Sequence, residues 1–168
     1  MPNEGAVPAL SEGRFDRREA FADLVRGALS AAAHQGWNEI VFSDPDFADW
    51  PLGERASIEA LQAWSASGRR LLLLAGRFDL IERGHARFVT WRRTWDHIVE
   101  CRAAGRSGTA EEAPSAFWTP TWCLHRIDPE RSRGVCSSDT RARRDLRESF
   151  DERWRQGRPA FPASTLGL

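Results

Sequence analysis

The stretch GWNEIVFSDPDFADWPLGERASIEALQAWSASGRRLLLLA, residues 36–75, decides the fold. Residues 39–42 have the composition of a short strand, and residues 71–75 form an uninterrupted apolar run typical of a strand buried on both faces. Between them, four apolar side chains recur at helical spacing: Leu52, Ile58, Leu61 and Trp64. A strand, a helix and a second strand with short connections predict a right-handed crossover and therefore a parallel pair. We expect an α/β protein whose mixed sheet has a parallel βαβ core flanked by helices.

Helices and a hairpin extend this pattern on both sides. Apolar residues in steps of three and four predict an amphipathic helix over residues 16–35, and aromatic residues at the same spacing predict another over residues 88–101. Alternating side chains over residues 121–127, followed by a turn and the short run 135–136, predict a β-hairpin. Asp139 then has the position of an N-cap for a final helix.

The chain length predicts one domain, because 168 residues suffice for a single core. Residues 1–14 are rich in Pro, Gly and small side chains, which predicts a flexible N-terminal arm. Residues 15–156 hold the domain, with a loop expected at 104–116. Residues 157–168 form a C-terminal tail rich in Pro and Gly.

Composition excludes several classes of chemistry. All 24 basic residues are arginine, so catalysis by a lysine amine is impossible, and tyrosine is absent too. A formal net charge of zero disfavours nucleic acid as a partner and disfavours a polybasic membrane anchor. The sequence has neither an apolar run of the ~20 residues that a membrane span needs nor a signal-peptide pattern, so we expect a cytoplasmic protein. Its three cysteines are expected to be free thiols.

The order of elements between Phe21 and Leu74 resembles a half-domain of the phospholipase D superfamily. Helix, strand, Asp-rich turn, helix, basic pair and leucine-rich strand follow one another, and Phe150 and Trp154 are similar to the closing helix of such half-domains. The chain as a whole resembles a family of uncharacterised bacterial proteins. The resemblance implies the half-domain topology but no activity, because none of the four histidines begins the superfamily's His-x-Lys-x4-Asp motif. We therefore expect a catalytically degenerate member.

Arginines offer candidate contacts to an anion. Arg92 and Arg93 lie in a cluster of Trp, Arg and acidic residues, while Arg126 and Arg133 belong to a C-terminal third with ten arginines against seven acids. A guanidinium forms bidentate hydrogen bonds to carboxylate or phosphate, so these four residues are candidate ligand-binding residues. Solvated helix faces laced with ion pairs are the more common explanation of such clusters.

Zinc is the first alternative. His97 and Cys101 would converge on one helix face, and Cys123 and His125 would share one face of a strand. These four side chains match the ligand types of tetrahedral zinc, with Cys136 as a substitute ligand. No CxxC motif supports the site, and buried structural cysteines are common.

Magnesium-dependent phosphate hydrolysis is the second alternative. Asp44, Asp46 and Asp49 follow the first strand of the βαβ unit, where carboxylates often bind Mg²⁺ at the edge of a sheet. The competing interpretation is structural, with a turn at Pro45 and Asp49 as the N-cap of the next helix.

No pattern in the sequence completes a catalytic site. The favoured interpretation is a non-enzymatic binding or interaction module without a cofactor, which recognises an anionic group or self-associates. Its partner is an unidentified protein or a second copy of the chain.

Overall fold

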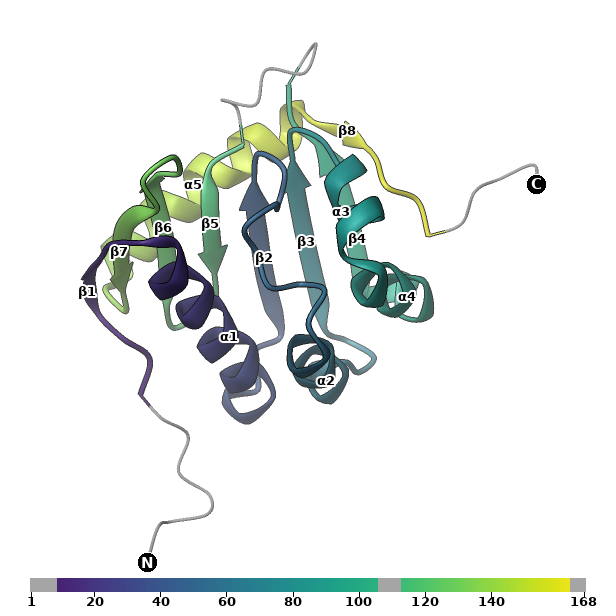
Figure 1. Ribbon diagram of the computed structural model, residues 1–168, viewed down its shortest axis with the longest axis horizontal. Coiled ribbons are helices and arrows are strands. Elements are labelled where there is room, and N and C mark those ends of the chain that lie inside the picture. Colours follow the sequence, from purple (N-terminus) through teal and green to yellow (C-terminus); the bar gives the residue numbers. More distant parts are fainter. Residues whose placement is uncertain (1–8, 106–112, 164–168) are drawn as a thin grey trace, which may run out of the picture.

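A mixed β-sheet with helices on both faces forms the protein (Figure 1). The computed structural model describes residues 9–105 and 113–163. In spatial order, the strands of the described part are β1 (Gly13–Phe15), β7 (Arg133–Ser137), β6 (Cys123–Asp128), β5 (Ser115–Trp118), β2 (Glu39–Asp44), β3 (Arg70–Ala75), β4 (Val99–Ala103) and β8 (Arg158–Pro159). Strands β2, β3 and β4 are parallel, and every other pair is antiparallel. The predicted α/β class and the parallel βαβ core are confirmed.

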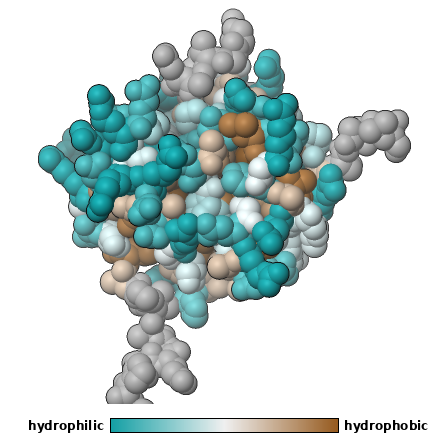
Figure 2. All heavy atoms as spheres, in the orientation of Figure 1, coloured by the Kyte–Doolittle hydropathy of each residue, from teal (hydrophilic) through white to brown (hydrophobic). Residues whose placement is uncertain are grey.

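The helices divide unequally between the two faces of the sheet (Figure 1). The front face carries α1 (Arg18–Gln35), α2 (Arg55–Trp64), α3 (Asp79–Gly84) and α4 (Ala86–Thr94). A single long helix, α5 (Thr140–Gln156), crosses the back face. Figure 2 shows that the outer surface of the front layer is mostly hydrophilic. No helix of the described residues is long and apolar enough to cross a bilayer.

Local sequence explains where the helices begin and end. Helix α1 ends because Gly36 adopts the left-handed conformation, with φ 67°, and donates its N–H to the carbonyl of Ala32 at 3.1 Å. Asp139 caps α5 as predicted, since its carboxylate accepts the N–H of Ala142 at 3.0 Å. Asp49 is not the N-cap of α2, which follows Glu54 instead.

The core has two layers of different size. On the front face, aromatic rings from α1, β2, β5 and the loop after β2 contact one another, with Trp50 at 5.3 Å from Phe42 and 4.8 Å from Phe47 between ring centroids. On the back face, Phe150 and Trp154 of α5 pack with Val41, Leu72 and Leu74 of the central strands. Alternation along β2 and β3 sends neighbouring side chains to opposite layers, which explains why Ile40–Phe42 and Leu71–Ala75 are uninterrupted apolar runs.

The predicted helix over residues 88–101 is only half correct. Helix α4 ends at Thr94, a 3₁₀ turn spans Asp96–Ile98, and β4 follows in parallel pairing with β3. Ile98 continues the apolar spacing through the turn, although the backbone leaves the helical conformation at Trp95. Cys101 is therefore on a strand.

The predicted boundaries need three corrections, all of them at sheet edges or in the loop. Residues 13 and 14 of the predicted arm belong to β1, and residues 115–116 of the predicted loop begin β5. Within the predicted tail, β8 pairs with β4. The remaining predictions for residues 1–8, 106–112 and 164–168 lie outside the described residues.

Candidate functional site

Arg126 lies inside a buried polar cluster. Its side chain is 3% exposed and donates to Asp44 and Asp49, each at 3.0 Å. The hydroxyls of Ser115 and Ser132 accept from the same guanidinium at 2.9 and 3.2 Å. Four of the five N–H groups of a guanidinium are thus used inside the protein. Arg126 is not available to an external anion, which corrects its assignment as a ligand-binding residue.

The carboxylates after β2 stabilise this cluster. Asp44 is 1% exposed; one of its oxygens accepts from Arg126, and the other accepts the N–H groups of Asp46 and Phe47 at 3.2 and 2.8 Å. Asp49 accepts from Arg126 and lies 3.4 Å from the guanidinium of Arg18. No group of three or more His, Cys, Asp and Glu side chains among the described residues could hold a metal ion. The proposed magnesium site is therefore not formed.

The four proposed zinc ligands do not meet. Cys101 is on β4, whereas Cys123 and His125 are on β6, and three strands lie between them. That separation is four strand spacings, or about 19 Å. Cys101 and Cys136 also pack in the front core, whereas Cys123 packs against α5 at the back. His97, in the 3₁₀ turn, is no longer one helical turn from Cys101. The predicted site of His97, Cys101, Cys123 and His125 is therefore not formed.

All three thiols are buried, and burial raises their pKa values. From an ordinary value of 9.0, the pKa rises to about 12 for Cys101, about 11 for Cys123 and about 12 for Cys136. Each thiol is protonated at neutral pH and is a poor nucleophile.

Stability is expected to fall as the pH rises above 9. A pKa raised on folding means that the unfolded chain loses its thiol protons first, so the stabilisation is complete below pH 9 and is lost toward pH 11 and 12. Each thiol contributes a slope of up to about 1.4 kcal/mol per pH unit. Because the chain has no lysine or tyrosine, no other side chain titrates strongly there.

Urea unfolding at several pH values, followed by tryptophan fluorescence under reducing conditions, measures this effect. Cys101→Ala should remove about a third of the slope. A midpoint that is constant between pH 8.5 and 10.5 would contradict the prediction.

Arg92 and Arg93 line a pocket on the front side of the molecule. It encloses about 460 Å³ between α3, α4 and the segment after β8, and Glu82 and Phe161 also line it. Arg92 is buried and donates to Asp96 at 2.9 Å and to the carbonyl of Phe161 at 3.2 Å. Arg93 is exposed and makes no ion pair or hydrogen bond with the described residues. The structure thus brings together two of the four predicted arginines, one fixed and one free.

The wall opposite α4 comes from the C-terminal segment. Phe161 is buried and stacks on Phe78 of the loop before α3, with ring centroids 5.5 Å apart and an interplanar angle of 3°. Ala160 donates its N–H to the carbonyl of Cys101 at 3.1 Å, which continues the contact of β8 with β4. Sequence analysis assigned this segment to a tail and so missed Phe161 as part of the site. The available signal in the sequence was an aromatic residue between Pro159 and Pro162.

Arg133 lies far from this pocket, on β7 near the opposite edge of the sheet. Its guanidinium lies 3.3 Å from Asp16, with both side chains about 60% exposed. The four arginines therefore do not form one site.

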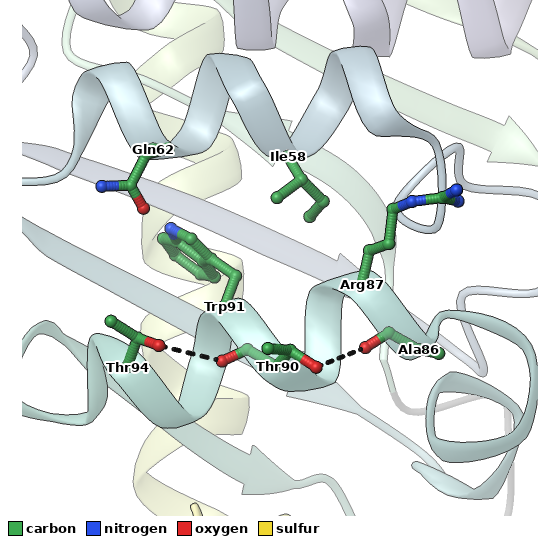
Figure 3. A pocket seen from close by; sticks show the side chains of 7 residues that line it. All are labelled: Ile58, Gln62, Ala86, Arg87, Thr90, Trp91 and Thr94. Atoms are coloured by element: carbon green, nitrogen blue, oxygen red, sulfur yellow. Dashed lines mark hydrogen bonds between the residues drawn. The ribbon is translucent and has the colours of Figure 1, made fainter.

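A groove between α2 and α4 is the third candidate (Figure 3). Its volume is about 410 Å³, but its polar groups are engaged within the protein. Thr90 and Thr94 donate to carbonyls of their own helix, as Figure 3 shows, and Arg87 donates to the carbonyl of Gly53 at 2.8 Å. The side chain of Trp91 fills the floor and donates to Ser65 at 3.0 Å. Every polar side chain of this groove thus has at least one protein partner, whereas Arg93 in the other pocket has none among the described residues.

The fold resembles that of a solved archaeal protein. A structure of TrmBL2, described as an archaeal chromatin protein with a novel mode of DNA binding, matches with a TM-score of 0.65 and 16% identity. The match covers 91% of this chain and 55% of that one, so the chain spans about half of TrmBL2. No protein-family model and no curated protein matches the sequence. The likeness shows a shared fold alone, and the phospholipase-D-like topology stays a prediction.

This comparison corrects one prediction about partners. The zero net charge led us to disfavour nucleic acid. A fold of this kind occurs in a protein described as binding DNA, so that exclusion is wrong. Net charge is a sum over the whole chain, whereas recognition of an anion depends on the few groups that face it.

Proposed function

We propose that the chain is a non-catalytic binding module that recognises an anionic, phosphate-bearing group in the Arg92–Arg93 pocket. One observation carries the proposal: a hollow of about 460 Å³ contains an exposed guanidinium without a protein acceptor among the described residues, beside a second guanidinium held rigidly. A guanidinium presents several charged N–H donors in one plane, and inside a preformed hollow this group can bind phosphate or carboxylate. A phospholipase-D-like half-domain without its catalytic set is compatible with this role.

The other charged side chains of the pocket restrict the chemistry of the ligands that it can bind. Asp96 already neutralises Arg92, and Glu82 adds a carboxylate to the lining. A bare polyanion would be repelled by Glu82, whereas a phosphate attached to a hydrogen-bond donor could use both Arg93 and Glu82. A nucleoside monophosphate has this chemistry, and the phosphate can equally belong to a nucleic-acid backbone. The likeness to a DNA-binding protein supports including the second source.

Arg93→Gln is expected to weaken binding of the phosphate group by about tenfold to a hundredfold. The variant removes a charge-assisted hydrogen bond, worth about 1.5–3 kcal/mol, without altering a contact in the core. Titration calorimetry with AMP and fluorescence anisotropy with a labelled DNA duplex measure the two sources separately. Arg155→Gln is the matched control, because Arg155 is exposed on α5 and should leave both affinities unchanged.

The two probes distinguish the two sources of the phosphate group. Arg93-dependent binding of AMP alone identifies a small-molecule site, whereas Arg93-dependent and salt-sensitive binding of duplex identifies a backbone contact. Equal affinities of the wild type and Arg93→Gln, or no binding of either probe, would overturn the proposal.

A further inference from the structure

A third hollow lies on the opposite face of the sheet, between α5 and the β6–β7 hairpin. It encloses about 300 Å³ and is mainly apolar, with Cys123, Val135 and Leu146 in its lining. Its polar lining includes His125 and Asp145. It shares no residue with the Arg92–Arg93 pocket, so an inference about it does not depend on the function proposed above.

The arrangement of the back face explains why this hollow exists. Helix α5 is the one helix of the described part that covers this face, and the hairpin extends past it (Figure 1). Val135 and Ile127 are the large hydrophobic residues exposed among those described, at 36% and 64%. Val135 is the cross-strand partner of His125, so these two side chains share the face that lines the hollow, whereas a register irregularity between His125 and Asp128 interrupts the alternation before Ile127. Val135 therefore adds exposed apolar surface to the lining of the hollow.

The lining contains one charged group, the carboxylate of Asp145. That side chain is 66% exposed, and its ion-pair partner Arg141 lies at 4.0 Å and is 84% exposed, so the pair is loose. Arg153 is turned toward α5 itself, where it donates to the carbonyl and hydroxyl of Ser149 at 3.1 and 2.6 Å. The hollow thus presents a carboxylate that a ligand can approach.

His125 adds a neutral hydrogen-bonding group. Its ring makes no hydrogen bond with the described residues, although half-buried in the lining. Burial lowers the pKa of His125 below 6.5, and the nearby charge of Arg153 lowers it further. The imidazole is therefore neutral at pH 7, with one nitrogen donating and the other accepting.

We propose that this hollow binds a small primary amine with an aromatic or aliphatic body. The ammonium group pairs with Asp145 and donates to the free nitrogen of His125. The apolar body contacts Val135, Leu146 and Cys123. A hollow of about 300 Å³ has room for a single aromatic ring with a short side arm.

Three probes of nearly equal shape and different charge test the proposal: benzylamine, benzyl alcohol and benzoate. Chemical shifts of the His125 ring and the Val135 methyl groups report binding at this place in an NMR titration. We expect benzylamine to bind about threefold to fivefold more tightly than benzyl alcohol, because the pairing carboxylate is solvated, and benzoate to bind most weakly.

Two variants keep the proposal falsifiable. Asp145→Asn should bring benzylamine down to the affinity of benzyl alcohol, whereas Glu152→Gln, an equal charge change at an exposed position of α5, should leave the preference intact. Ala142→Leu puts a larger side chain into the lining and should abolish the shifts with all three probes. Binding of benzoate as tight as that of benzylamine, a preference that survives Asp145→Asn, or shifts unchanged in Ala142→Leu would each overturn the proposal.

Discussion

Arg126→Met is expected to lower the free energy of unfolding by about 3–5 kcal/mol, because it leaves a buried carboxylate without its counter-charge. Asp44 is 1% exposed and would keep only the two backbone N–H groups of its turn. The hydroxyls of Ser115 and Ser132 would lose the same donor. Urea unfolding followed by tryptophan fluorescence measures the loss.

Two further variants test the cause. Arg133→Met removes an arginine from the neighbouring strand, but its ion pair with Asp16 is solvent-exposed, so the cost should be below about 1 kcal/mol. The double variant Arg126→Met/Asp44→Asn removes both charges and should be more stable than Arg126→Met alone. A double variant as unstable as the sum of the two single variants would show that the charges do not interact.

Gly134→Ala is expected to cost about 3 kcal/mol. A Cβ at this position of β7 would lie inside van der Waals contact of the carbonyl oxygen of His125, and 2.7 Å from both Arg126 Cα and Phe15 Cζ. Two of these three atoms belong to the backbone of the paired strand and cannot move without breaking the β6–β7 ladder. The close packing of β1, β7 and β6 therefore requires glycine.

Gly27→Ala is the matched control. Gly27 lies within α1, and no heavy atom is within 4 Å of a Cβ added there. Alanine should therefore stabilise the protein by about 0.5–1 kcal/mol through its higher helix propensity. Thermal unfolding followed by circular dichroism distinguishes the two variants by the sign of the change in Tm. A Gly134→Ala protein as stable as the wild type would contradict the steric argument.

Elements with a strong local period were predictable from the sequence. The amphipathic pattern of α1, the leucines of β3 and the stripe of Leu146, Phe150 and Trp154 on α5 all identify the buried face directly. β4 and β5 were not predictable. β4 comes directly after Trp91, Trp95 and Ile98, whose helical spacing hides the start of the strand, and β5 has only four residues after a stretch rich in Gly and Ala. Both strands exist because neighbouring strands pair with them.

The candidate site was also predictable only where local sequence determines it. Arg92 and Arg93 were recognisable as candidate anion contacts, but the wall formed by the segment after β8 depends on a tertiary contact with β4. The pairing of Arg126 with Asp44 joins residues 82 positions apart, and nothing near either residue predicts it. The sequence analysis treated these two residues as parts of different sites, whereas they neutralise each other.

The two outermost strands have a consequence for self-association through the sheet. The edges are β1, with three residues, and β8, with two, while the six-residue strands β2, β3 and β6 are interior. A short edge offers few unpaired backbone groups to a neighbouring molecule, and Pro159 in β8 has no N–H to donate. The terminal segments thus protect the longer strands against edge-to-edge pairing, the first step of β-aggregation. Resistance of this sheet to aggregation depends on a few residues at each side, not on the core.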